Sequence, residues 1–145
     1  MAAWRNSVAV DVVTKAPGSP RGGIRDTKGA GDAAEARALD YLAARGLVLV
    51  RRNYRVARGP SARGGEVDLI LRELDGTLVF VEVRARRGTD HGGAAASVGW
   101  GKQRRVVYAA RHYLLGLREL PPCRFDVVAI DGERIEWLKA AFDAA

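Results

Sequence analysis

The apolar positions of the chain follow two different periods, which together predict a mixture of helices and strands. Apolar residues at helical spacing favour a helix from Thr27 to about Arg45, with Gly46 ending it. A second amphipathic helix is predicted over residues 102–117. Apolar runs with strand character lie at residues 47–56, 66–71, 77–85, 123–130 and 134–138. This order of elements predicts an α/β fold in which helices flank a mixed central β-sheet.

The N-terminal segment differs in composition from the rest of the chain. Prolines and glycines punctuate residues 1–27, which contain only one short apolar run, so we expect an irregular, mobile leader. Residues 28–145 are expected to form a single domain, because 145 residues leave little room for a second hydrophobic core. With 48% hydrophobic and 28% charged residues, the chain has enough apolar surface to fold.

The charge of the chain indicates the class of its partner. A formal net charge of +7 favours a polyanion, which is either nucleic acid or an anionic membrane surface. The sequence has no apolar run of about 18 residues and no secretory signal pattern. We therefore expect a soluble, cytoplasmic protein.

Charged residues interrupt the apolar pattern of the two central strands. Because side chains alternate along a strand, Glu66 and Asp68 share a face of the first strand. Glu82 and Arg84 likewise share a face of the second. A two-residue turn would send the acids of the two strands to opposite faces, whereas a three-residue loop at 74–76 pairs Asp68 with Glu82. The same register pairs Glu66 with Arg84, and the glycine that ends the loop permits it.

Two carboxylates facing each other across a ladder repel, and a hard divalent cation such as Mg²⁺ or Mn²⁺ best offsets that repulsion. Glu35 adds a third acid, because it lies on the inward stripe of the first predicted helix. It is either a site carboxylate and metal ligand or the partner of an arginine such as Arg55 or Arg84. The structural alternative is a salt-bridged surface hairpin, which explains Glu66 with Arg84 but not the stacked acids.

Basic residues bracket the proposed site and suit contacts with phosphates, which give affinity without sequence readout. The candidates for binding nucleic acid are Arg55, Arg86, Lys102 and Arg105. Lys102 follows the small-residue loop GGAAASV, which enters a helix N-terminus where backbone amides can approach a phosphate closely. A set of solvated charges is the alternative for many of these side chains.

Four other residues receive structural interpretations. Trp100 and Trp137 are expected in the core or at a dimer contact rather than as stacking platforms for bases. Asp126 is expected on the surface of its strand. The single cysteine, Cys123, excludes an internal disulfide and is expected as a core thiol.

Several segments of the chain carry a resemblance to a known family. In order and spacing, from about Lys28 to Phe142, the chain resembles the bacterial YraN family. That family is similar to archaeal Holliday-junction resolvases and to the PD-(D/E)xK nuclease superfamily, which has a restriction-endonuclease-like core. The segments that carry the resemblance are GDAAEARALDYL, NYR, GGEVDLI, VFVEVRARR, GGAAASV, CRFDVVAI and IEWLKAAF.

The resemblance implies roles for individual residues. Asp68 and Glu82 become the metal-binding acids, and Glu35 becomes the acid borne on the helix. Arg84 holds the position of the superfamily's lysine, and Glu66 belongs to the YraN pattern itself. Valine replaces the proline of the superfamily's name, and arginine replaces its lysine. Arginine cannot act as a base at neutral pH, but it can hold a phosphate and stabilise developing negative charge.

These inferences leave two classes of function open. The first is a metal-dependent endonuclease that hydrolyses phosphodiester bonds in structured DNA, with Asp68 and Glu82 holding one or two Mg²⁺ ions. A resolvase that cuts two strands symmetrically would act as a homodimer. The second is a catalytically weak or inactive module that binds nucleic acid on the same fold, which the arginine at position 84 makes credible.

Overall fold

The computed structural model describes residues 27–57, 64–85 and 98–144, and it contains the helices and strands that the sequence predicts. The predicted leader, apart from Thr27, lies outside these residues, as do Arg86 and most of the GGAAASV loop. Within the described part, no helix is long and apolar enough to cross a membrane. In chain order the elements are α1 (Thr27–Ala43), β1 (Val48–Val56), β2 (Gly65–Arg72), β3 (Leu78–Ala85), α2 (Trp100–Leu115), β4 (Cys123–Asp131) and β5 (Arg134–Phe142).

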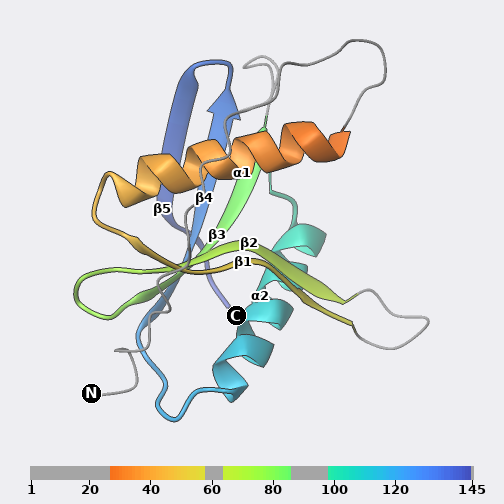
Figure 1. Ribbon diagram of the computed structural model, residues 1–145. Helices are drawn as coiled ribbons and strands as arrows, with labels where there is room; N and C mark the ends of the chain where they lie inside the picture. The colour runs from red at the N-terminus through yellow and green to blue at the C-terminus, as the bar shows by residue number, and fades with distance from the viewer. Residues whose placement is uncertain (1–26, 58–63, 86–97, 145) are drawn as a thin grey trace.

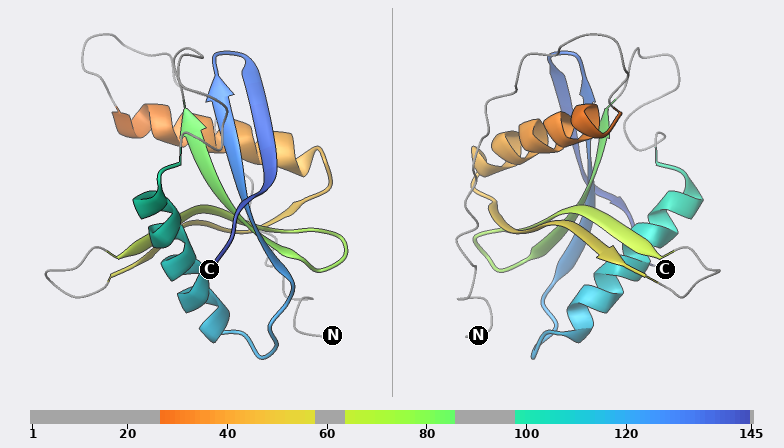
Figure 2. Two further views of the ribbon diagram at one scale, coloured as in Figure 1. Left: turned by 180° about the vertical axis from the view of Figure 1, so that it is seen from behind. Right: turned by 45° about the vertical axis from the view of Figure 1, so that its right-hand side comes forward.

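The five strands form one mixed sheet in the order β1-β2-β3-β4-β5. Strands β3 and β4 are parallel, and the other neighbouring pairs are antiparallel. A parallel pair needs a long crossover connection, which here contains α2. Helix α1 crosses one face of the sheet and α2 packs on the other, while the twist of the sheet turns β1 and β2 steeply away from β4 and β5 (Figures 1 and 2). The predicted α/β class with a mixed, helix-flanked sheet is confirmed.

Helix α1 covers its face of the sheet with a short apolar stripe. Ala38, Leu39 and Leu42 are almost completely buried there, against strand residues of β2, β3 and β4. The helix ends just before Gly46, whose φ of +94° is a left-handed conformation that glycine adopts without steric cost. The backbone N–H of Leu47 then donates to the carbonyl of Leu42, as in a Schellman motif. The predicted glycine stop is confirmed.

The β2–β3 hairpin has the predicted register. Arg72 pairs with Leu78, and the backbone N–H of Glu73 donates to the carbonyl of Thr77 at 2.9 Å, which leaves a three-residue loop. Gly76 ends this loop with a φ of +94°. A type I turn followed by a left-handed glycine is the usual three-residue hairpin connection, and it matches the twist of the strands.

Helix α2 lies unusually close to the first residue of β2. A Cβ atom added to Gly65 would come within 2.5 Å of the Arg105 carbonyl oxygen and 2.7 Å of the Ala109 nitrogen. Only glycine therefore allows this approach of helix to strand. The contact brings the N-terminal half of α2 to the same region of the sheet as the start of β2.

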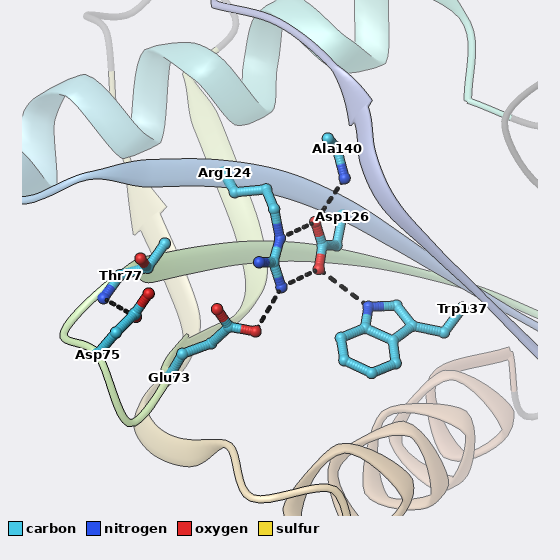
Figure 3. A network of polar contacts seen from close by, with 7 residues as sticks. All are labelled: Glu73, Asp75, Thr77, Arg124, Asp126, Trp137 and Ala140. Atoms are coloured by element: carbon cyan, nitrogen blue, oxygen red, sulfur yellow. Dashed lines mark hydrogen bonds and ion pairs between the residues drawn. The ribbon is translucent and has the colours of Figure 1, made fainter.

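Asp126 on β4 corrects the prediction that it lies on the strand surface, because its side chain is completely buried. Arg124 donates to both of its oxygens, at 2.8 and 3.0 Å, and Trp137 Nε1 donates to Oδ2 at 2.9 Å (Figure 3). The backbone N–H of Ala140 donates to Oδ1 at 2.9 Å. Arg124 also binds Glu73 at 3.0 Å, which links this network to the β2–β3 hairpin. A local apolar pattern does not reveal a network whose members come from β4, β5 and the β2–β3 hairpin.

The structure also bears on the two other structural interpretations. Trp137 is half-buried against the α1 side of the sheet, as predicted. Trp100 is 70% exposed, with the Arg104 guanidinium over its ring, so it does not lie in the core, and its dimer contact stays a prediction. Cys123 is exposed rather than a core thiol, because it stands at the very start of β4, where the strand leaves the core.

Candidate active site

Asp68 and Glu82 lie where strands β2 and β3 separate. The ladder between these strands joins residues 69–72 to residues 78–81. Beyond it, Asp68 Oδ2 accepts a hydrogen bond from the backbone N–H of Val83 at 2.8 Å, so a side chain bridges the gap between the strands. The carboxyl groups of Asp68 and Glu82 lie within hydrogen-bonding reach of each other. The prediction that these two acids share a face is therefore confirmed.

Both acids are nearly removed from solvent, with exposed fractions of 7% for Asp68 and 2% for Glu82. Burial raises the pKa of Asp68 above its usual value. Burial and the adjacent charge of Asp68 raise the pKa of Glu82 to about 8. Among the described residues, Glu82 Oε2 receives no hydrogen bond. The site thus combines two carboxyl groups that resist ionisation with one buried oxygen that lacks a donor.

The cation beside these acids comes from α2. Lys102 Nζ lies 3.4 Å from Glu82 Oε1, and its charge opposes the rise in pKa of both acids. Within the described residues, no hydrogen bond or ion pair joins Arg84 to Asp68 or Glu82. Lys102, predicted as a phosphate contact, therefore occupies the place beside the acids that the resemblance gave to Arg84.

Glu35 reaches the same region from α1. The Asn53 amide on β1, with its nitrogen turned toward Glu35, donates to both carboxylate oxygens at 3.2 and 3.1 Å. Burial, followed by the charges of Asp68 and Asp32, raises the pKa of Glu35 to about 7, and the charge of Arg52 opposes this rise. In the described structure neither Arg55 nor Arg84 forms an ion pair with Glu35, so these two predicted partners are wrong.

The predicted pairing of Glu66 with Arg84 is also wrong. The β2–β3 ladder stops at Leu69, before it reaches these residues. Glu66 instead lies across from Arg55 on β1, with Arg55 Nε 3.4 Å from Glu66 Oε1. Because β2 lies between β1 and β3, its charged side chains had two possible neighbours. Glu66 pairs with β1 and not with β3 because β2 and β3 diverge beyond Leu69.

The predicted phosphate-binding residues are only partly brought together. Lys102 and Arg105 both belong to α2, whereas Arg55 is exposed on the edge strand β1. Arg105 Nε is buried without a hydrogen-bond partner in the described residues. Arg86 lies outside the described residues.

The donor set at the site consists of a pair of acids. In residues 27–57, 64–85 and 98–144, no three Asp, Glu, His or Cys side chains converge in a group that could hold a metal ion. Glu35 is near enough to Asp68 for their charges to interact, and its carboxylate accepts hydrogen bonds from the Asn53 amide. Mg²⁺ and Mn²⁺ accept one or two protein carboxylates and complete their shell with water and phosphate oxygens. The unused oxygen of Glu82 and the repulsion between the acids fit such a cation.

Comparison with known proteins agrees with the resemblance read from the sequence. The family described as "Uncharacterised protein family UPF0102", which is the YraN family, matches residues 34–130. The chain belongs to this family. A UPF0102 protein of Methylibium petroleiphilum is 66% identical over 119 residues, which cover 82% of this chain and 98% of the relative. A UPF0102 protein of Paracidovorax citrulli is 55% identical over 135 residues, 92% of this chain and 98% of the relative.

One residue of the site was not found from the sequence. Asn53 lies in the NYR segment of this UPF0102 chain, and it adopts a φ of +49° within β1. An asparagine in a strand rich in charged and apolar residues was a weak signal, since asparagine tolerates the left-handed region far better than most residues do.

Proposed function

We propose that this UPF0102 protein is a metal-dependent nuclease with a restriction-endonuclease-like PD-(D/E)xK core, which binds and hydrolyses structured DNA. The observation that carries the proposal is the contact between two buried carboxyl groups, Asp68 and Glu82, one of whose oxygens lacks a donor. Buried charges without full compensation destabilise a fold, so their presence supports a binding role rather than a stabilising one.

Asp68 and Glu82 would hold Mg²⁺ or Mn²⁺ through their carboxylates. A divalent cation there supplies Lewis-acid polarisation of the phosphate and a nucleophilic water at neutral pH. Lys102, 3.4 Å from Glu82, would bind a phosphate oxygen and stabilise the negative charge that develops on it. Glu35, on the other side of Asp68, would orient the attacking water or accept its proton. Arg84 would contact a phosphate farther along the strand.

The surface next to the acids supports a nucleic-acid substrate. Lys102 and Arg105 lie in the first two turns of α2, whose N-terminus carries the positive end of the helix dipole. Arg55 adds a basic side chain at the edge of the sheet. With a formal net charge of +7, such contacts favour binding that weakens as salt concentration rises.

The second candidate is a module that binds nucleic acid without cleaving it. The observation that favours it is the ion pair between Lys102 and Glu82, which already supplies part of the positive charge that the acids need. Arg84 cannot replace a titratable lysine. A protein of this kind would bind DNA with the same dependence on salt and would not bind Mg²⁺ at Asp68.

The deciding experiment compares wild type with Asp68→Asn on labelled junction, flap, duplex and single-stranded DNA in Mg²⁺ or Mn²⁺. The nuclease proposal expects cleavage of at least one structured substrate and a loss on the order of a hundredfold or more in the variant. Asp40→Asn is the matched control, because Asp40 is an exposed acid of α1 whose side chain forms no ion pair with the described residues. Asp68→Asn should also abolish stabilisation by Mg²⁺ in thermal unfolding, while Asp40→Asn should keep it.

The other outcomes separate the candidates. DNA binding that weakens with salt, without cleavage or stabilisation by Mg²⁺, would replace the nuclease with the binding module. Binding that does not change with salt would remove nucleic acid as the partner. Sedimentation of the free and DNA-bound protein would show whether it acts as the symmetric dimer that cleavage of two strands requires.

A further inference from the structure

Asn53 has an unusual backbone conformation in the middle of the edge strand β1. Its φ is +49°, a region that few residues other than glycine adopt. Its neighbours remain in the ladder, because Arg52 pairs with Leu69 and Tyr54 with Val67. The strand therefore keeps its pairing on both sides of a strained residue. Such strain persists where the surrounding structure holds it, and it is concentrated at functional sites.

The register places Asn53 beside the proposed site. Since Arg52 pairs with Leu69 and Tyr54 with Val67, Asn53 lies between these pairs, across from Asp68. In a regular strand Val67 and Leu69 would lie on the same face of the sheet. Here Val67 packs in the apolar cluster under α2, whereas Leu69 packs in the cluster under α1. Both strands thus depart from regular alternation at the level of Asp68.

The Asn53 side chain links this distortion to α1. Its amide nitrogen lies 3.2 Å from Glu35 Oε1 and 3.1 Å from Oε2, so one group contacts both oxygens of the carboxylate. The charged groups that face Glu35 are Asp68 on β2, Asp32 on α1 and Arg52 on β1. The two acids repel Glu35, and the amide is the hydrogen-bond donor that opposes this repulsion.

We propose that Asn53 is a positioning residue, which uses its left-handed backbone to hold the Glu35 carboxylate beside Asp68. This role rests on the proposed nuclease function, in which Glu35 orients or deprotonates the attacking water. Without the amide, Glu35 would turn away from the negative charge of Asp68 toward solvent. Groups that orient the residues of a metal site commonly affect activity by about 10- to 100-fold.

The test separates the amide from the backbone. Asn53→Gly removes the side chain and keeps the left-handed conformation without strain. We expect kcat on the cleaved DNA to fall about 10- to 100-fold with KM unchanged. Asn53→Ala removes the amide and also strains the backbone, so its unfolding temperature should fall as well. Arg55→Ala, two residues away on the same strand, is the control and should change KM more than kcat.

A double-mutant cycle with Glu35→Gln shows whether Asn53 acts through Glu35. We expect Asn53→Gly to have little further effect on kcat in the Glu35→Gln background. Two results would overturn the positioning role: an equal loss of kcat in the wild-type and Glu35→Gln backgrounds, or a wild-type kcat in Asn53→Gly. Neither result would affect the nuclease function, which is tested by the loss of activity in Asp68→Asn. If wild type and Asp68→Asn are equally inactive, the proposed function fails, and the role of Asn53 fails with it.

Discussion

Two regions of the sheet bury a carboxylate, and they do so in opposite ways. Asp126 receives hydrogen bonds from Arg124, Trp137 and the backbone of Ala140, so both of its oxygens have donors (Figure 3). Glu82 has one lysine near Oε1 and no donor at Oε2 among the described residues. Each acid is 2% exposed or less. Asp126 and Glu82 are thus almost equally buried, whereas their supply of hydrogen-bond donors differs.

The difference distinguishes a structural acid from a functional one. A buried carboxylate with complete hydrogen bonding fixes its neighbours and stabilises the fold around it. A buried carboxylate that lacks donors and faces another acid costs stability, and natural proteins keep such groups where they bind or react. The network of Asp126 therefore supports the start of β4 and the end of β5, whereas Asp68 and Glu82 are the acids for which we propose a cation.

The largest effect on stability is expected at Asp126. Asp126→Ala leaves the Arg124 guanidinium and the Trp137 indole N–H without their acceptor, so the free energy of unfolding should fall by about 3–5 kcal/mol. Denaturant unfolding measures this loss. Asp40→Ala, which removes an exposed acid, should change stability by less than about 0.5 kcal/mol. A loss below about 1 kcal/mol in Asp126→Ala would show that the network adds little to stability.

Removing the charge of Glu82 should raise the free energy of unfolding, whereas removing that of Asp126 lowers it. Its pKa in the folded protein, about 8, lies above the ordinary value of 4.5, so the folded state holds its proton more tightly than the unfolded state does. Stability from this group is present below about pH 4.5 and is lost as pH rises toward 8. Without metal, Glu82→Gln should match wild type near pH 5 and exceed it by about 2–4 kcal/mol at pH 8. Equal pH profiles for the two proteins would remove the contrast with Asp126.

The smallest effect is expected at Gly76, in the hairpin that joins the two regions. Ala at a φ of +94° is strained, so Gly76→Ala should lower the free energy of unfolding by about 1 kcal/mol. The same exchange at Gly31, inside α1 with no atom within 4 Å of an added Cβ, should raise it by about 0.5–1 kcal/mol. Thermal unfolding of both variants compares them. An unfolding temperature of Gly76→Ala equal to that of wild type would mean that the loop does not hold the register.

Much of the fold could be predicted from the sequence because its signals are local. Gly46 marks the end of α1, and the loop ending at Gly76 determines by parity that Asp68 and Glu82 share a face. These features depend on a few neighbouring residues. Strand alternation and loop length predict that the two acids meet, although β2 departs from regular alternation at Asp68 and the ladder ends at Leu69.

The predictions that were wrong concern side chains whose partners lie far away in the sequence. Glu66 contacts Arg55 because β2 and β3 separate beyond Leu69, and no sequence period encodes that separation. Asp126 is buried because donors arrive from β5, on the other side of a turn. The position of Lys102 beside Glu82 depends on how closely α2 packs against the strands. In the sequence, the only sign of this close packing is Gly65.

Strand β5 bulges near Ala140, where its register with β4 shifts and Ala140 has a φ of +51°. This bulge has a consequence for self-association. Strand β5 is an edge of the sheet formed by the described strands, and there the Ala140 N–H donates inward to Asp126, so the edge offers one fewer donor to a second chain. The other edge, β1, presents exposed Arg51, Asn53 and Arg55. Lone edge strands commonly invite aggregation, and both edges here discourage strand-to-strand pairing between copies. If the proposed nuclease dimerises on DNA, we expect its copies to associate through helices or loops and not by extending the sheet.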